Sequence, residues 1–227
     1  MKKLTLIVCL VLGLLIAVIP EARALSVTID RISGYYTGNG GEFNIEPSDW
    51  AGITGYDTKA LVGDGFESFC LERSEYVTIP GTYNAVFNSK AVMGGNPPNG
   101  DPISIGTAYL YNQFALGQLT GYNYTVGSGR AVDAGALQNA IWMLEGEITW
   151  DSSNEFIALL LGIPDYSSEA LATANNNGVI PVAVLNLYNS NGSLAQDQLV
   201  RVPEPGILIL LGIALSAVGL AARRYRF

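Results

Sequence analysis

The fold class is decided where the chain changes its hydrophobic period, in "ISIGTAYLYNQFALGQL" (residues 103–119) and "GRAVDAGALQNAIWMLEGE" (residues 129–147). In the second stretch, apolar residues recur at intervals of three and four, through Ala134, Leu137 and Ile141. This spacing places them on one face of an α-helix. Both stretches therefore predict helices.

The segments on either side of these helices have a different pattern. Residues 25–90 contain short runs of β-branched and aromatic residues separated by glycines, such as "LSVTIDRISGYY" and "GTYNAVFNS", which predict strands. Helical patterns extend through residues 103–175, and strand character returns in residues 179–202. Strands, then helices, then strands again predict an α+β body, in which a helical subdomain is inserted into a β-sandwich.

The N-terminal residues 1–24 have the pattern of a secretory signal peptide. Lys2 and Lys3 precede an apolar run over residues 4–19, and a small-x-small tripeptide ends at Ala24. We expect cleavage after Ala24 and export of the remaining chain. The body then comprises residues 25–202.

The C-terminal residues 203–227 contain an apolar span over residues 206–222, followed by a basic end. The span is long enough to cross a bilayer as a helix, and the terminal arginines favour a cytoplasmic end. A plain membrane anchor is one interpretation of this pattern.

The order of elements at this end resembles the PEP-CTERM sorting tail, a tripeptide followed by a span and a basic cluster. The matching residues are Pro203, Glu204, Pro205, Arg223, Arg224 and Arg226. The resemblance implies processing by an exosortase-type membrane peptidase in a Gram-negative envelope. The protein would first be anchored in the inner membrane and then reach the cell surface, or be secreted into an exopolysaccharide matrix.

The composition of the body excludes several classes of function. Residues 25–202 contain six basic and eighteen acidic residues, a net charge near −12, which argues against binding nucleic acid or an anionic membrane surface. The chain has no histidine. Ser-His-Asp triads, Cys-His nucleophiles and most zinc sites need an imidazole, so these chemistries are excluded.

Cys70 and Gln138 are the two residues of the body that need an explanation. The other cysteine, Cys9, lies in the signal peptide, so Cys70 has no cysteine partner in the exported chain. Cys70 could be a small buried hydrophobe or form an intermolecular disulfide. Gln138 interrupts the apolar face of the predicted helix. The simplest interpretation is a buried glutamine whose side chain is hydrogen-bonded to backbone groups.

The segments that contain these residues resemble the thioester domains of bacterial surface adhesins. "FCLE" (residues 69–72) matches the cysteine segment, and "LQNAIW" (residues 137–142), after a "TAYLYNQF" helix, matches the TQxAIW-like glutamine segment. The resemblance implies an internal thioester between Cys70 and Gln138. The supporting motif positions are Phe69, Leu137, Ala140, Ile141 and Trp142. Leu137 stands where threonine is usual in that family.

The expected function is covalent adhesion to an amine- or hydroxyl-bearing surface, protein or polysaccharide partner, through a bond used once. No cofactor, metal or catalytic residue is expected, and the protein would not be an enzyme that turns over. The alternative is a non-reactive structural or adhesive protein of the extracellular polysaccharide matrix. A polysaccharide hydrolase has only Glu145 and Glu147 in its favour, and neighbouring carboxylates at a helix end are usually solvated.

Overall fold

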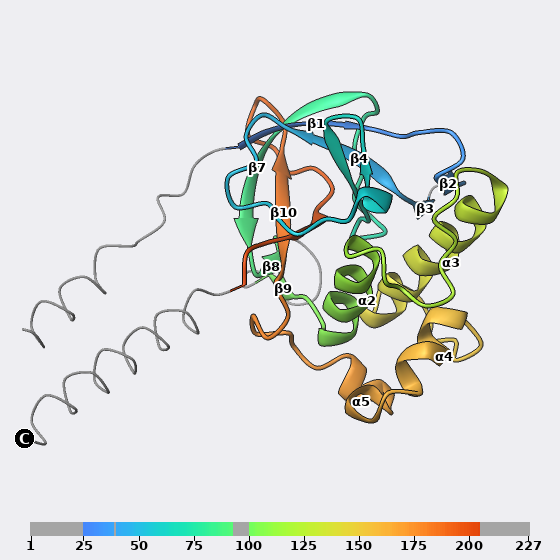
Figure 1. Cartoon of the computed structure of the whole chain (residues 1–227). Helices are drawn as coiled ribbons and strands as arrows, with labels where there is room; N and C mark the ends of the chain where they lie inside the picture. Colours follow the sequence, from blue (N-terminus) through green and yellow to red (C-terminus); the bar gives the residue numbers. More distant parts are fainter. Residues whose placement is uncertain (1–24, 39, 93–99, 205–227) are drawn as a thin grey trace, which may run out of the picture. The chain divides into compact units, whose positions relative to one another are not determined.

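The computed structural model describes residues 25–38, 40–92 and 100–204, which form one compact body (Figure 1). Its main element is a seven-stranded sheet with the order β11-β10-β7-β1-β4-β6-β5, in which all neighbouring strands are antiparallel. Its strands are β1 (Leu25–Asp30), β4 (Phe43–Pro47), β5 (Leu61–Val62), β6 (Gly65–Ser68), β7 (Gly81–Asn88), β10 (Val182–Tyr188) and β11 (Gln198–Arg201). Two further pairs are β2 (Tyr36–Thr37) with β3 (Gly40–Gly41), and β8 (Lys90–Ala91) with β9 (Asp101–Pro102).

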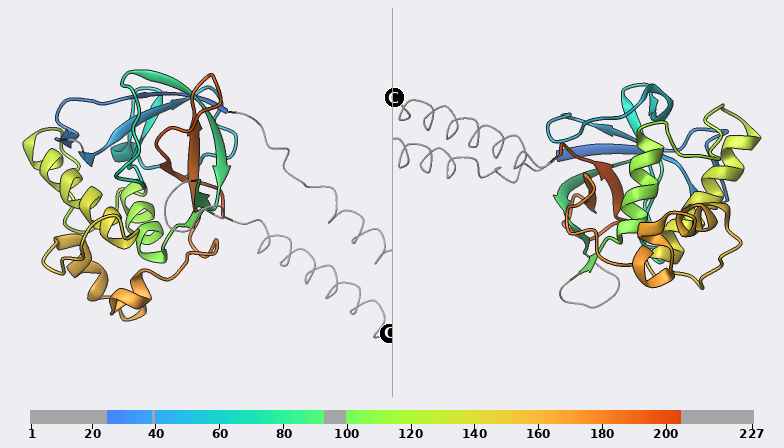
Figure 2. Two further views of the ribbon diagram at one scale, coloured as in Figure 1. Left: turned by 180° about the vertical axis from the view of Figure 1, so that it is seen from behind. Right: turned by 60° about the horizontal axis from the view of Figure 1, so that its bottom comes forward.

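The helices gather on one side of the sheet, as the opposite views of Figures 1 and 2 show. They are α2 (Ile105–Ala115), α3 (Ser128–Leu144), α4 (Glu155–Leu161) and α5 (Glu169–Ala172), with 3-10 turns at Thr58–Ala60 and Pro164–Tyr166. Three of these four helices begin with a side-chain cap. Ser104 accepts from the Thr107 N–H, Asn154 caps α4 and Ser168 caps α5, which satisfies N–H groups that have no partner in the first turn.

The predicted α+β class is confirmed, but the described strands do not divide into the two facing sheets of a sandwich. Strands from both ends of the body join a single sheet, because β10 pairs with β7 and extends the sheet toward β11. Local strand patterns do not specify which edges pair, so the sequence did not indicate this arrangement.

Two apolar cores lie in the body, and the segment 69–71 separates them. The helix-side core includes Phe69 and Leu71 together with Leu137 and Ile141 of α3. The sheet-side core contains the intervening residue 70 and the buried side chains of β1, β4 and β6. Successive residues of an extended segment point to opposite faces, so residues 69–71 contribute to both cores.

No helix among the residues that the structure describes is long and apolar enough to cross a membrane. The predicted signal peptide (residues 1–24) and the predicted transmembrane helix (residues 206–222) lie outside the described residues.

Candidate functional site

Cys70 lies two residues beyond the end of β6, on an extended segment that pairs with β11. Cys70 forms an isolated antiparallel bridge with Gln198. The N–H of Leu199 donates to the Phe69 carbonyl at 3.0 Å, and the N–H of Leu71 donates to the Asp197 carbonyl at 3.1 Å. The predicted strand over "FCLE" is thus shorter than expected, but β11 holds Cys70 in an extended conformation.

The structure brings Gln138 of α3 into direct contact with Cys70. The Gln138 Oε1 accepts from the Cys70 backbone N–H and from the Sγ–H, each at 3.3 Å. The Gln138 Nε2 donates to the Cys70 carbonyl at 2.7 Å. Both side chains are fully buried. Two residues separated by 68 positions therefore meet as an isolated thiol–carboxamide pair.

The surroundings of the pair keep the thiol protonated in its resting state. Burial raises the pKa of the Cys70 thiol to about 12, while the positive charge of Arg31 and the indole N–H of Trp142 act in the opposite direction. The Trp142 Nε1 makes no hydrogen bond of standard geometry among the described residues. The sulfur therefore lies in an apolar site, with two groups nearby that would stabilise its anion.

The β2–β3 hairpin covers Gln138 with backbone instead of side chains. A Cβ atom on Gly40 would lie 3.1 Å from the Gln138 Cγ and 3.7 Å from the Trp142 Cη2, so the hairpin is in close contact with both. A Cβ on Gly135 of α3 would lie 2.6 Å from the Thr37 Cγ2. Glycines on both elements thus allow the hairpin to seal the pair from solvent.

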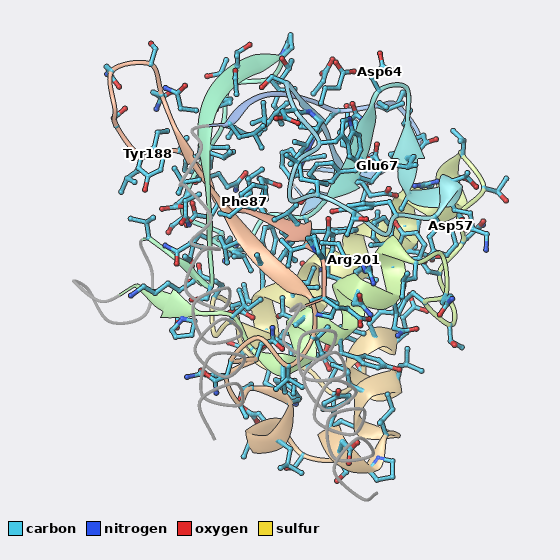
Figure 3. The ribbon with its side chains drawn as sticks, turned by 60° about the vertical axis from the view of Figure 1, so that its left-hand side comes forward. Asp57, Asp64, Glu67, Phe87, Tyr188 and Arg201 are labelled. Atoms are coloured by element: carbon cyan, nitrogen blue, oxygen red, sulfur yellow. The ribbon has the colours of Figure 1, made fainter. Side chains whose placement is uncertain are left out.

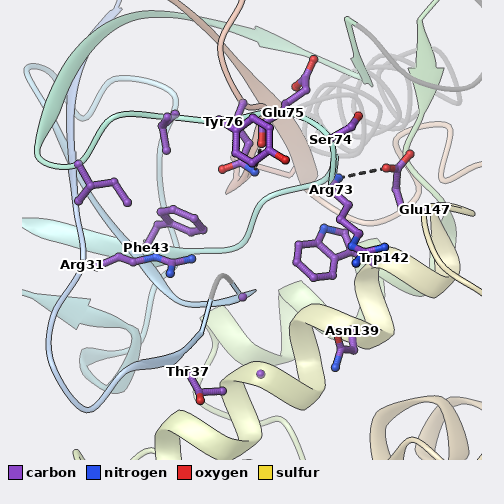
Figure 4. Close-up of a pocket in the computed structure, with 15 residues that line it drawn as sticks. Arg31, Thr37, Phe43, Arg73, Ser74, Glu75, Tyr76, Asn139, Trp142 and Glu147 are labelled. Carbon is purple, nitrogen blue, oxygen red and sulfur yellow. Dashed lines mark hydrogen bonds between the residues drawn. The ribbon is translucent and has the colours of Figure 1, made fainter.

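A groove of about 740 Å3 lies on the outer side of this cover (Figure 4). Gly40 and Trp142 line the groove; Gly40 packs against the Gln138 side chain and the Trp142 indole lies beside the Cys70 sulfur, so these two residues form the wall between solvent and the pair. The other residues that line the groove are Arg31, Thr37, Phe43, Arg73, Ser74, Glu75, Tyr76, Val77, Ile79, Gly135, Asn139, Glu147 and Gln196.

The predicted supporting residues surround the pair from both cores. Phe69, Ala140 and Ile141 are fully buried in the helix-side core, whereas Trp142 is in the sheet-side core beside Cys70. Leu137 is also fully buried in the helix-side core. Leu137 thus contributes apolar packing next to Gln138.

The two candidate carboxylates, Glu145 and Glu147, both accept hydrogen bonds within the protein. Glu145 accepts from the Ser104 N–H and hydroxyl, and burial raises its pKa to about 7. Glu147 accepts from the Arg73 N–H at 3.0 Å. Burial, followed by a hydrogen bond with Glu147, raises the pKa of Glu72 to about 9. The interpretation of solvated carboxylates at this helix end was wrong for Glu145, because the start of α2 packs against it.

A second buried polar cluster was not found by sequence reasoning. Arg130, near the start of α3, donates to both carboxylate oxygens of Glu42, each at 2.6 Å. Nearby, burial raises the pKa of Glu67 to about 8, and its Oε2 has no hydrogen-bond partner among the described residues. Figure 3 shows Glu67 among the interior side chains, whereas Asp64 lies at the β5–β6 turn. A lone arginine after a glycine-rich turn gave no sequence signal for such a partner.

The arrangement of Cys70 and Gln138 suits acyl transfer better than metal chemistry. Among residues 25–38, 40–92 and 100–204, no group of three or more acidic or cysteine side chains is placed to hold a metal ion. A thiol held against a carboxamide in a dry site has the proximity that intramolecular acyl transfer requires.

Comparison with protein families identifies a PEP-CTERM protein-sorting motif over residues 201–226. This motif implies export and membrane-anchored sorting by exosortase, a membrane peptidase, in agreement with the sequence prediction. The motif begins at Arg201, the last residue of β11. Neither the curated proteins nor the solved structures contain a match to the chain.

Proposed function

We propose that this exported, exosortase-sorted protein forms an internal thioester between Cys70 and Gln138 and uses it once, to attach covalently to an amine- or hydroxyl-bearing partner. The observation that carries the proposal is the contact between the Cys70 Sγ and the Gln138 Oε1 at 3.3 Å, with both side chains fully buried. The protein is consumed by this reaction and is not a turnover enzyme. Its final location is the cell surface or the surrounding matrix.

The contacts around the pair support each part of the bond-forming step. The Cys70 sulfur attacks the Gln138 Cδ, the C–N bond breaks, and the thiol proton leaves with the amide nitrogen as ammonia. The Cys70 N–H already donates to the Gln138 Oε1, so it is placed to stabilise the negative charge that develops on this oxygen. No cofactor takes part.

The burial of the pair supports the persistence of such a bond. A thioester hydrolyses when water reaches it, and Gly40 and Trp142 separate the pair from the groove. A partner that enters through the groove would then attack the Gln138 carbonyl carbon and release the Cys70 thiol.

One observation favours a second candidate function, a non-reactive structural or adhesive protein of the extracellular matrix. The Gln138 carboxamide is hydrogen-bonded on both sides, because its Oε1 accepts from the Cys70 N–H and its Nε2 donates to the Cys70 carbonyl. A neighbouring β-strand would pair with Cys70 in the same way. Such a clamp would join α3 to the sheet without any reaction.

Intact mass spectrometry of the full chain, purified in detergent and in a buffer without amines, separates the two candidates. We expect the wild-type protein to be lighter than its sequence by one ammonia, because the thioester has formed. Cys70→Ala is the matched control, and its mass should equal that of its sequence. A wild-type protein of full mass, with one more thiol that titrates after denaturation than Cys70→Ala has, would contradict the thioester.

A further inference from the structure

The groove and the thiol–carboxamide pair share one wall. Gly40 and Trp142 line the groove on one side; on the other side Gly40 packs against Gln138, and the Trp142 indole lies beside the Cys70 sulfur. Asn139, the next residue of α3, is exposed and lines the same groove. The groove is therefore a surface depression separated from the Gln138 side chain by a single wall of the chain.

Arg31 places a positive charge in this groove next to the pair. Its guanidinium lies 4.0 Å above the Phe43 ring, and its Nη1 donates to the Gly38 carbonyl in the turn of the β2–β3 hairpin at 3.1 Å. Figure 4 shows Arg31 beside Phe43 on the side of the groove opposite Arg73. Of the charged groups near Cys70, Arg31 has the largest effect on its sulfur, and this effect favours the thiolate.

A positive charge at this place discriminates between the two possible acceptor groups. An alkylamine has a pKa near 10.4, so at pH 7 it approaches as an ammonium ion, and only about one molecule in 2,500 carries the free electron pair. Repulsion by Arg31 lowers the local concentration of the ammonium ion. A hydroxyl group is neutral, so Arg31 does not repel it and its oxygen keeps a free electron pair at pH 7.

The two carboxylates that line the groove are hydrogen-bonded within the protein, and two arginines, Arg31 and Arg73, line the same groove. Glu147 accepts from the Arg73 N–H and shares a hydrogen bond with Glu72. Glu75 accepts from the Asp197 N–H at 3.2 Å, and burial, together with the charge of Asp197, raises the pKa of Glu75 to about 7. Both carboxylates thus have partners within the protein.

The remaining lining of the groove suits a neutral ligand with many hydroxyl groups. Asn139 and Ser74 offer donors and acceptors, and Tyr76, with 78% of its surface exposed, offers an uncovered aromatic ring. The volume of about 740 Å3 is within the range of sites that hold a small organic ligand.

We propose that the groove binds a neutral polyol, such as a sugar unit, and presents one of its hydroxyl groups to the Gln138 carbonyl, with Arg31 as the residue that selects a hydroxyl over an ammonium acceptor. This inference rests on the proposed thioester. The hydroxyl oxygen forms an ester bond to the Gln138 Cδ, the C–S bond breaks, and the hydroxyl proton passes to the departing Cys70 sulfur. Arg31 and the Trp142 N–H stabilise the sulfur as it leaves.

The test incubates the full chain, in detergent at pH 7, with glycerol and methylamine at equal concentration, and measures both adducts by intact mass. We expect Arg31→Gln to lower the ratio of glycerol adduct to methylamine adduct by about tenfold relative to wild type, because the repulsion of the ammonium ion is lost. Arg31→Lys should retain the wild-type ratio. Arg73→Gln is the matched control in the same groove and should leave the ratio nearly unchanged.

The salt dependence of the wild-type ratio gives a second measurement that needs no variant. Added sodium chloride should lower the ratio, since it screens the charge of Arg31. A thioester-bearing protein whose ratio responds neither to Arg31→Gln nor to salt would overturn this inference and leave the proposed function intact. A wild-type protein that has lost no ammonia would overturn both.

Discussion

Helix α3 contributes to two buried polar pairs that differ in charge and in the number of bonds around them. Arg130 meets Glu42 near the start of the helix, and Gln138 meets Cys70 about two turns later. The Arg130 guanidinium also donates to the carbonyls of Tyr124 and Lys59 and lies 3.9 Å above the Tyr35 ring. The Tyr122 hydroxyl completes the first cluster by donating to Glu42.

The difference in charge explains why the Cys70–Gln138 pair can react and the Arg130–Glu42 pair cannot. The Arg130–Glu42 pair has partners on every side, so any movement of it exposes an uncompensated charge to an apolar interior. The Cys70–Gln138 pair is neutral, and its sulfur can form a new bond without leaving a buried charge. The charged pair therefore holds the start of α3 in place. Because Gln138 lies on the same helix, its position relative to Arg130 is fixed as well.

The largest expected effect is the loss of the charged pair. Arg130→Met should lower the free energy of unfolding by about 3–5 kcal/mol, because Glu42 would be left buried without a counter-charge. Chemical denaturation of the full chain in detergent measures this change. Glu42→Gln added to Arg130→Met is the matched control and should recover part of the loss. A cost below about 1 kcal/mol for Arg130→Met would show that the charged pair does not fix the helix.

A smaller effect is expected when the neutral pair is broken. In the Cys70→Ala background, which cannot form the thioester, Gln138→Leu should cost about 1–3 kcal/mol, since the N–H and carbonyl of residue 70 would lose their side-chain partners in a buried site. The double variant should retain full mass. Gln113→Leu on α2, where the side chain is half-buried, is a control for the change of residue type. If Gln138→Leu cost nothing in this background, the clamp between α3 and the sheet would have no energetic role.

An effect that is gradual in pH is expected from a carboxyl group beside the charged pair. Burial, followed by the charge of Glu42, raises the pKa of Glu67 from 4.5 to about 8. Between these values the folded state binds more protons than the unfolded state, so stability is full below pH 4.5 and falls as the pH rises toward 8. The slope contributed by Glu67 reaches about 1.4 kcal/mol per pH unit at most.

Thermal unfolding of wild type and Glu67→Gln at pH 5 and pH 8 measures this contribution. We expect the wild type to unfold at a lower temperature at pH 8, and the variant to lose less stability between the two values. The variant should keep some dependence, because burial also raises the pKa of Glu72, Glu75 and Glu145. An identical pH dependence in both proteins would exclude Glu67 as its source.

The helices were predictable from the sequence because their evidence is local. The apolar spacing of residues 129–147 predicted a helix that the structure has at Ser128–Leu144, and residues 103–119 predicted Ile105–Ala115. The pairing of β10 with β7 joins residues about a hundred positions apart. No local period encodes such a choice, so a sandwich was expected where one sheet formed.

The Cys70–Gln138 pair could also be predicted from local sequence, whereas the groove and the Arg130–Glu42 pair could not. Cys70 and Gln138 could be singled out from sequence because each departs from a local pattern, Cys70 as the one cysteine of the body and Gln138 as an amide on the apolar face of a helix, and the structure places them in contact. The partner of Arg130 and the residues that form the groove come from separate loops and strands. They become neighbours only after the chain has folded, and their residue types are common on any surface.

The position of β11 determines how the body responds to mechanical load. A pull applied at Glu204 enters the fold through Gln198–Arg201, and this strand is bonded laterally to residues 69–71 by the Leu199 N–H and the Asp197 carbonyl. These bonds run across the direction of the pull, so they are loaded together in shear rather than opened one at a time. Because β11 also pairs with β10, a pull on the tail would be shared between the segment of Cys70 and the rest of the sheet.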